Sequence, residues 1–309
     1  MSENLAVSKT LEKDAELGAP LKRVAYEAGM LLGLEATQDE QSYHRRRLNR
    51  HNYWLHGFGT LLGMVVAIDP PTSGGSDPIL TRMTVSPGMG IDGLGREVLI
   101  NEGYCIDLGE WLNVQTETTL RDGYDEVTNL LWLKVAVRYQ ECAVAQQPVL
   151  ARKLNISTDA VQPSRTADSF ILELSTELPP TSSDDRFGPW SVHAPVENDT
   201  PAELTDTERD YLDALALSDP DLHRQLQLQT RFLHALGPDP VSPQIAADEL
   251  EESASILLAR VSIDVADIND ILNVESGDPS VNPNNIFVNN LVRPFLTTAS
   301  QLAYLDRTP

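Results

Sequence analysis

The feature that most constrains the fold is a stretch of strict alternation at residues 130–139. Leu131, Leu133, Val135 and Val137 fall on one side of an extended chain, and polar or mixed side chains fall on the other. Successive side chains of a β-strand point to opposite faces, so a period of two predicts a strand with one buried face. Such a face has to be covered by a second layer, and the chain must therefore supply further strands or helices.

Further strands are predicted on both sides of this stretch. Apolar or alternating runs occur at 61–68, 79–85, 89–91, 96–100, 170–174 and 255–263. The sequence from Asp92 to Gly95 separates two of these runs and has the composition of a hairpin turn. Its glycines are not followed by a helix, so they indicate a turn and not a phosphate-binding loop. These runs predict a β-rich domain over 61–180, completed by C-terminal strands and a tail in 251–309.

Ahead of the strands, the hydrophobic period is that of a helix. Residues 1–20 are polar and predict a flexible N-terminal arm. Residues 21–60 predict a helical docking segment whose helix is capped by Thr37 or Asp39 and ends near Gly57. The acidic start and the arginine-rich end of this helix complement the helix dipole.

A second helical region interrupts the strands at residues 181–250. It begins with a loop rich in Pro, Ser, Asp and Asn. Thr205 and Glu208 then have the spacing of a capping box, and Asp219 followed by Pro220 predicts the start of a second helix. The expected fold is therefore α+β, with a β-rich core, an N-terminal helical segment and an inserted helical hairpin.

Charge is spread unevenly along the chain. The net charge is −23, but residues 1–60 hold eight basic and eight acidic residues, so residues 61–309 carry all of it. An acidic body repels phosphate backbones and anionic headgroups, which disfavours nucleic acid and membrane surfaces as partners. No run of 18 apolar residues and no signal-peptide core is present. We therefore expect no membrane insertion and a cytoplasmic location.

Motifs of chemistry are sparse. His44 and His51 are two helical turns apart, about 10 Å along the axis, which is too far for two ligands of one ion. His56 is predicted near the helix end, and neither HExxH nor CxxC occurs. Cys105 and Cys142 are predicted to be reduced, buried thiols, although their spacing does not exclude a pairing. The sequence contains no GxSxG motif, and no set of residues in it indicates a catalytic triad. It therefore predicts no catalytic residue, no metal and no cofactor.

The helical docking segment supplies the candidate binding residues. Arginine and large aromatic side chains are the types that dominate protein–protein hot spots, and they are concentrated here in an otherwise acidic chain. The same composition is equally typical of a helix packed on its own sheet. The candidate partner-binding residues are Tyr43, Arg45, Arg46, Arg47, Arg50, Tyr53 and Trp54.

Several segments together resemble a family of uncharacterised bacterial proteins. The resemblance runs through YHRRRLNRHNYWLHGFG, VSPGMGIDGLGREVLI, LWLKVAVRYQECAVAQQPV, SRTADSFILELSTELP, ILLARVSI and VRPFL, and spans most of 25–296 outside the insertion. Members of the family are encoded near the contractile machinery of phage tails and extracellular contractile injection systems. The resemblance implies a structural baseplate, collar or fibre-attachment protein without enzymatic activity. Its implied partners are other subunits of a particle that the cell can release. A homo-oligomer of this chain is the alternative assembly.

Two other classes of function remain alternatives. A receptor- or glycan-binding fibre module would present Trp111, Trp132 and Trp190 for stacking on sugars. A hydrolase would need two carboxylates about 5–10 Å apart in a pocket, a geometry that sequence does not give.

Overall fold

The computed structural model of the chain describes residues 21–69, 81–148, 161–179, 204–223, 226, 254–265, 268 and 286–301. The chain divides into two units, Met1–Arg50 with Phe187–Glu252 and His51–Arg186 with Ser253–Pro309. The described residues form helices and several antiparallel sheets. The chain thus has an α+β fold with a β-rich core, which confirms the predicted fold class.

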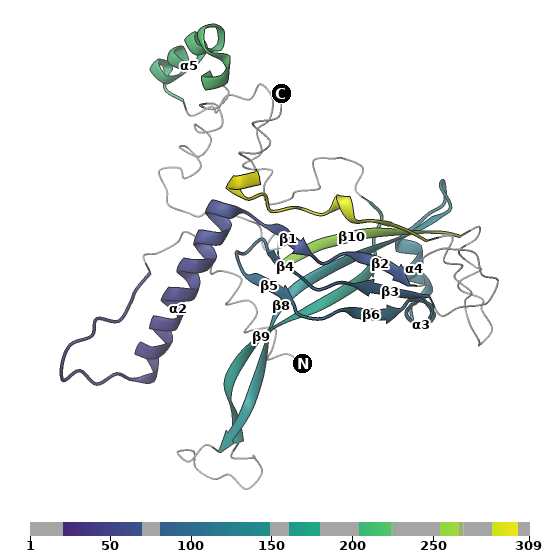
Figure 1. Ribbon diagram of the computed structural model, residues 1–309, viewed down its shortest axis with the longest axis horizontal. Helices are drawn as coiled ribbons and strands as arrows, with labels where there is room; N and C mark the ends of the chain where they lie inside the picture. Colours follow the sequence, from purple (N-terminus) through teal and green to yellow (C-terminus); the bar gives the residue numbers. More distant parts are fainter. Residues whose placement is uncertain are drawn as a thin grey trace. The chain divides into compact units, whose positions relative to one another are not determined.

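Three bent strands form one layer of the second unit (Figure 1). Each is divided by a bend into two parts: β1 (Gly59–Gly63) and β2 (Val66–Asp69), β3 (Arg82–Val85) and β4 (Gly88–Ile91), and β5 (Glu97–Ile100) and β6 (Tyr104–Asp107). Antiparallel pairing gives the order β1-β4-β5 on one side of the bend and β2-β3-β6 on the other. The hairpin predicted at Asp92 to Gly95 is confirmed as the β4–β5 turn.

Glycine makes the bend possible. Gly63 has a φ of +63°, and a Cβ at this position would overlap with the carbonyl oxygen of Pro87. A Cβ on Gly88 would overlap with the backbone N of Met64 in the same way. The two bent strands therefore approach each other backbone to backbone, a contact that only residues without a side chain allow.

The opposing sheet is built from longer strands. Its order is β11-β10-β8-β7, and β9 also pairs with β8. The bounds of these strands are Tyr124–Asp125 for β7, Leu130–Pro148 for β8, Val161–Thr176 for β9, Ser255–Asp264 for β10 and Ile286–Asn289 for β11.

Two short helices connect the layers after β6. They are α3 (Leu108–Asn113) and α4 (Glu117–Asp122). The side chain of Asp107 accepts from the Glu110 N–H at the start of α3, and Thr116 accepts from Thr119 at the start of α4. The caps explain why helices this short form at all, because each satisfies a backbone donor that the first turn leaves free.

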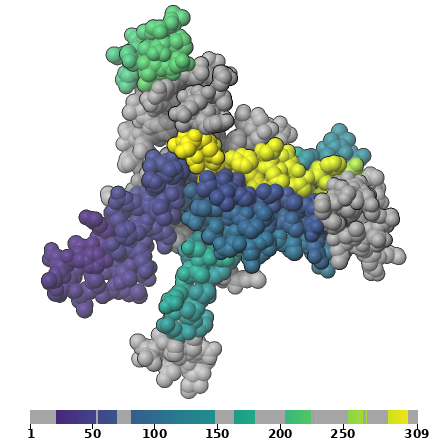
Figure 2. All heavy atoms as spheres, in the orientation of Figure 1, coloured from purple at the N-terminus to yellow at the C-terminus, as the bar shows by residue number. Residues whose placement is uncertain are grey.

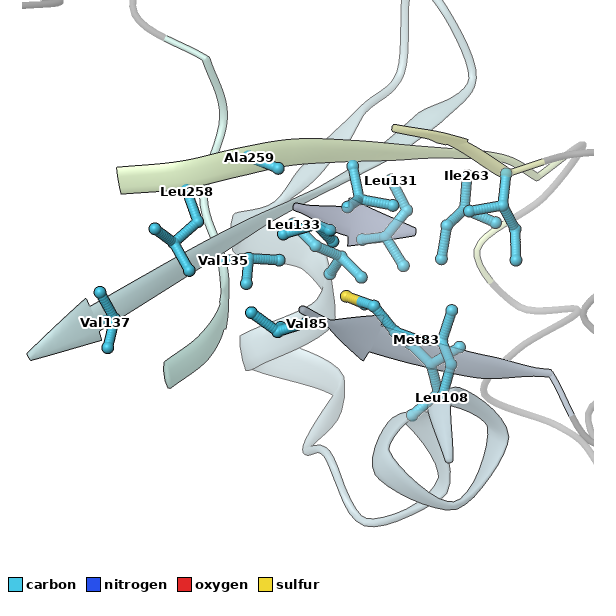
Figure 3. Close-up of a cluster of buried hydrophobic side chains, with 14 of the residues drawn as sticks. Met83, Val85, Leu108, Leu131, Leu133, Val135, Val137, Leu258, Ala259 and Ile263 are labelled. Carbon is cyan, nitrogen blue, oxygen red and sulfur yellow. The ribbon is translucent and has the colours of Figure 1, made fainter. Parts of the chain in front are cut away.

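The core lies between the two layers. Met83 and Val85 of β3 point toward the β8 side chains Leu131, Leu133 and Val135 (Figure 3). Leu131, Leu133, Val135 and Val137 are all buried, which confirms the predicted alternation. Strand β10 adds Leu258, Ala259 and Ile263 to the same cluster.

The segment after β11 closes one edge of the bent strands. Asn290 uses its side-chain amide as a peptide group would, since its Oδ1 accepts from Val66 N–H and its Nδ2 donates to Val66 C=O, both at 2.9 Å. Arg293 is buried and donates to the carbonyl of Gly63 at 3.1 Å and to Asn290. Thr60 of β1 exchanges backbone bonds with residues 294 and 296.

The β8–β9 hairpin extends well past the layers. Its ladder continues without a register shift from Leu133 opposite Thr176 to Pro148 opposite Val161. Residues 143–147 and 163–166 are exposed, and Figure 2 shows this part of the hairpin standing clear of the strand layers. We call residues 140–148 with 161–169 the β-arm. The sequence predicts β8 only to residue 139 and β9 only over 170–174, so the β-arm is a correction.

The first unit contains two described helices, α2 (Leu34–His51) and α5 (Asp206–Ser218). The capping box predicted at Thr205 and Glu208 is confirmed. Residues 220–223 are helical and the carboxylate of Asp219 accepts from Leu222 N–H, as expected for the second helix of the hairpin.

Two further predictions from the sequence are wrong, and three fall on residues outside the described ranges. Helix α2 starts at Leu34, and the hydroxyl of Thr37 donates to the carbonyl of Gly33 inside the helix, so neither Thr37 nor Asp39 caps it. Cys105 and Cys142 are free but not buried: Cys105 is exposed and Cys142 is half-buried. The predicted arm at 1–20, the loop at 181–203 and the end of the second helix lie outside the described residues.

Candidate protein-binding surface

In the first unit, a backbone N–H of the chain well before α2 binds to a side chain of the helix. Val24 N–H donates to a carboxylate oxygen of Glu40 at 3.0 Å, and the other oxygen of Glu40 lies 3.1 Å from Nε2 of His44. The bond from Val24 is the main reason that the pKa of Glu40 lies below its usual range. Glu40, which the sequence assigned to the first turn, thus anchors the preceding segment.

The segment held in this way exposes large apolar side chains. Their exposed fractions run from 46% for Leu32 to 95% for Leu31. We name the set the apolar run, and its members are Tyr26, Met30, Leu31, Leu32 and Leu34. Single exposed apolar residues are ordinary on protein surfaces, but five within nine positions are typical of a surface that a partner covers.

The arginines of α2 fall into two groups. Arg45 and Arg47 are exposed, whereas Arg46 and Arg50 are half-buried. The guanidinium of Arg47 donates to the hydroxyl of Tyr43 at 3.0 Å, one helical turn away. This bond restrains both side chains, and side chains that are already restrained lose less entropy in any contact with another molecule. Arg45 and Arg47 are therefore the predicted site arginines most accessible to a partner.

The last predicted site residues lie past the end of α2. Tyr53 and Trp54 fall in η2 (Asn52–His56), a π-helical turn closed by the bond from Gly57 N–H to the Asn52 carbonyl. The side chains of Tyr53 and Trp54 lie outside the described residues.

The π-turn brings together two histidines that sequence reasoning kept apart. Nε2 of His51 and Nε2 of His56 are 3.3 Å apart, and both side chains are exposed. The rings meet edge to face, with centroids 5.1 Å apart. Sequence reasoning missed this pair because it assumed α-helical geometry throughout, and Gly57 directly after His56 is the signal that the last turn differs.

A buried ion pair holds the β4–β5 turn. Asp92 is completely buried and accepts from Arg96 Nε at 2.6 Å and from the N–H groups of Leu94 and Arg96 at 2.9 Å. Burial raises the pKa of Asp92, and the charge of Arg96 opposes that effect. The guanidinium of Arg96 also lies over the ring of Tyr139, 5.0 Å from its centroid. The groups are used within the fold, so we assign them a structural role.

Tyr139 marks the point at which β8 leaves the layers. Its hydroxyl donates to Asp168 of β9 at 2.7 Å. Partial burial and the hydrogen bond to Asp168 raise the pKa of Tyr139 far above its usual value, so the hydroxyl stays protonated. The same residue is thus fixed by Arg96 on its ring and by Asp168 on its hydroxyl.

The tryptophans predicted for a glycan-binding alternative are not arranged as that alternative requires. Trp111 is half-buried and packs against the core, and Trp132 is half-buried on β8. Trp190 lies outside the described residues. The expectation that Trp111 and Trp132 are exposed is therefore wrong.

Within the described part of the chain, no three His, Cys, Asp or Glu side chains gather as a metal site. None of the described helices is long and apolar enough to cross a bilayer. In comparisons with known proteins, no protein-family model matches the chain and no curated protein matches it.

Proposed function

We propose that this protein is a structural assembly component of a phage-tail-like contractile particle, at its baseplate, collar or fibre attachment. It acts by binding other subunits through the apolar run and the neighbouring exposed face of α2. The apolar run is the observation that carries the proposal, because five large apolar side chains exposed by 46–95% cost free energy in water until a partner covers them.

Charge and preorganisation support the same surface. Residues 1–60 are neutral while the rest of the chain is strongly acidic, so like-charge repulsion is weakest here. Arg45 and Arg47 are exposed beside Leu48, which is itself 59% exposed. Arginine next to exposed leucine offers an apolar contact with a charged rim, a composition common at interfaces.

The β-arm supplies a second contact of a different kind. Among the described residues, no third strand pairs with the two strands of the β-arm, so their outer edges offer N–H and C=O groups to another strand. Such edges bind extended segments of other chains by adding a strand. The particle itself is proposed on the resemblance to proteins encoded near contractile-tail machinery.

The test is purification of the native complex through a tag on this chain, followed by mass spectrometry. We expect sheath, tube or baseplate proteins in the eluate, and their identity names the docking partner. Recovery of the chain alone, or as a small homo-oligomer, would refute the proposal.

Matched variants separate the binding surface from general surface effects. Leu31→Glu places a charge in the apolar run, and Leu217→Glu places the same charge on α5 at a leucine that is also 95% exposed. We expect Leu31→Glu to remove the co-purifying subunits and Leu217→Glu to retain them, with unchanged thermal unfolding of both. Equal recovery of the subunits with both variants would contradict the assignment of the surface.

A further inference from the structure

His51 and His56 are paired through their ring nitrogens, which lie within hydrogen-bond distance of each other. Their Nε2 atoms are 3.3 Å apart and both rings are exposed to solvent. A zinc ion binds imidazole nitrogen at about 2.0–2.1 Å with tetrahedral angles. Two nitrogens of one such ion are therefore separated by about 3.3 Å, since that is the chord of a tetrahedral angle at this bond length.

The local backbone explains how residues five apart come to share a face. In an α-helix, two histidines four residues apart lie on one face and bind a metal together, as in HExxH helices. A π-helical turn contains one residue more, because its hydrogen bonds run over five residues. The Gly57 N–H to Asn52 C=O bond closes such a turn directly after His51. Residues i and i+5 then take the place that i and i+4 have in an α-helix.

Because both rings are exposed, the space around an ion at this position is open to its other ligands. The two imidazoles supply two nitrogen ligands, and water fills the positions that remain, as in sites with open coordination. Imidazole suits zinc, copper and nickel, whereas magnesium and calcium prefer oxygen ligands.

We propose that His51 and His56 form a two-histidine chelating site for a divalent transition-metal ion of the zinc, copper and nickel group. The site goes beyond the proposed assembly function and does not depend on it. Binding requires both rings to present an unprotonated Nε2, because the nitrogen lone pair is the ligand.

The experiment is isothermal titration of the full-length chain with ZnCl2, in a buffer without chelators at pH 7.5. We expect one zinc site, weakened at least about tenfold by His51→Gln and equally by His56→Gln, since even outer-shell partners of metal ligands cost that much affinity. His44→Gln is the matched control, because His44 is an exposed histidine of the same helix as His51 and its Nε2 lies 3.1 Å from the carboxylate of Glu40. We expect His44→Gln to bind zinc as the parent chain does.

A spectroscopic readout counts the nitrogen ligands directly. With one equivalent of Cu²⁺, electron paramagnetic resonance of the parent chain should show coupling to two imidazole nitrogens, and each variant of the pair should show one. Absence of binding by the parent chain would overturn the proposal. It would also fall if His44→Gln weakened binding as much as the other two substitutions. Thermal unfolding without metal should be unchanged in all three variants, which separates lost ligands from lost fold.

Discussion

The two ends of the β8–β9 hairpin share one hydrogen-bonded ladder but not one environment. Toward the layers, Leu131 and Leu133 are fully buried and Val137 is buried as well. In the β-arm, Val144 is 38% exposed and both faces meet solvent. The backbone pairing is continuous from one end to the other.

The difference separates what pairing provides from what burial provides. Exchange of peptide–water for peptide–peptide hydrogen bonds contributes little net free energy, and an isolated two-stranded hairpin is marginal in water. Burial of apolar side chains contributes about 25 cal/mol per Å², so the stability of the hairpin resides at its inner end. The β-arm is ordered by its continuity with that end.

The largest expected effect comes from the Asp92–Arg96 ion pair of the β4–β5 turn, whose guanidinium lies over the ring of Tyr139, where β8 leaves the layers. Asp92→Ala leaves the guanidinium of Arg96 buried without its carboxylate. We expect a loss of about 3–5 kcal/mol in the free energy of unfolding, measured by urea denaturation at pH 7. Asp125→Ala is the control, because Asp125 lies at the end of β7 and its carboxylate accepts solvent-exposed hydrogen bonds from Val127 and Thr128 of its own turn. A loss below about 1 kcal/mol for Asp92→Ala would show that the pair is not isolated from water as described.

The second prediction compares the two ends of β8 with similar truncations. Leu133→Ala removes a fully buried side chain and should cost about 2–5 kcal/mol in the free energy of unfolding. Val144→Ala in the β-arm should change it by about 0.5 kcal/mol or less. Urea denaturation of the two variants gives both values. Similar losses at the two positions would mean that the β-arm is packed against other residues.

A third, smaller effect concerns acid stability at the inner end of β9. Glu177 lies 2.6 Å from Lys134 Nζ and 2.8 Å from Arg260. Burial acts to raise the pKa of Glu177, but its bonds to Lys134 and Arg260 outweigh burial and lower the pKa below its usual value. Because the pKa of Glu177 is lowered in the folded state, its full stabilisation is present above the pKa of the unfolded state, about 4.3. The stabilisation is lost as the pH falls through the pKa of the folded state.

Unfolding curves between pH 7 and pH 3 measure this effect. We expect Glu177→Gln to cost no more than about 1 kcal/mol at pH 7, since the carboxylate is partly exposed, and to reduce the loss of stability toward pH 3. An unchanged pH dependence in the variant would remove Glu177 from the groups that respond to acid.

The smallest expected effect is confined to the β-arm. Ala145 has a φ of +58°, a conformation that costs an L-residue roughly 1–2 kcal/mol and glycine little. Ala145→Gly also increases the entropy of the unfolded chain, so the net gain is about 0.5 kcal/mol. We expect slower amide hydrogen exchange at residues 142–147 with no change in global unfolding. Faster exchange there would indicate that the entropy term dominates.

Sequence patterns predicted the parts of the fold that burial controls. The alternation around Leu133 and the capping box at Thr205 both gave correct elements, because each is a local rule with a direct physical cause. The β-arm escaped prediction since its side chains face solvent on both sides and leave no period of two. Pro163 within β9 also argues against a central strand, and it is tolerated because β8 is the one described neighbour of β9.

The candidate site was predicted unevenly. The arginines of α2 were named from composition, and the structure separates exposed Arg45 and Arg47 from half-buried Arg46 and Arg50. The apolar run was missed because residues 26–34 have no strong periodicity, and only a fold shows which apolar side chains stay uncovered. The His51–His56 pair was missed because its approach depends on a π-turn, which sequence spacing read on an α-helix does not reveal.

Asn290 has a consequence for how the protein behaves at high concentration. The outward-facing N–H and C=O of Val66 lie on the free side of β2 and would serve as a template for another strand. Because the Asn290 amide already satisfies both groups, Val66 cannot pair with a strand of another chain, whereas no strand outside the hairpin pairs with the β-arm in the described part of the molecule. The two strand edges thus differ in how far the fold itself occupies their backbone groups.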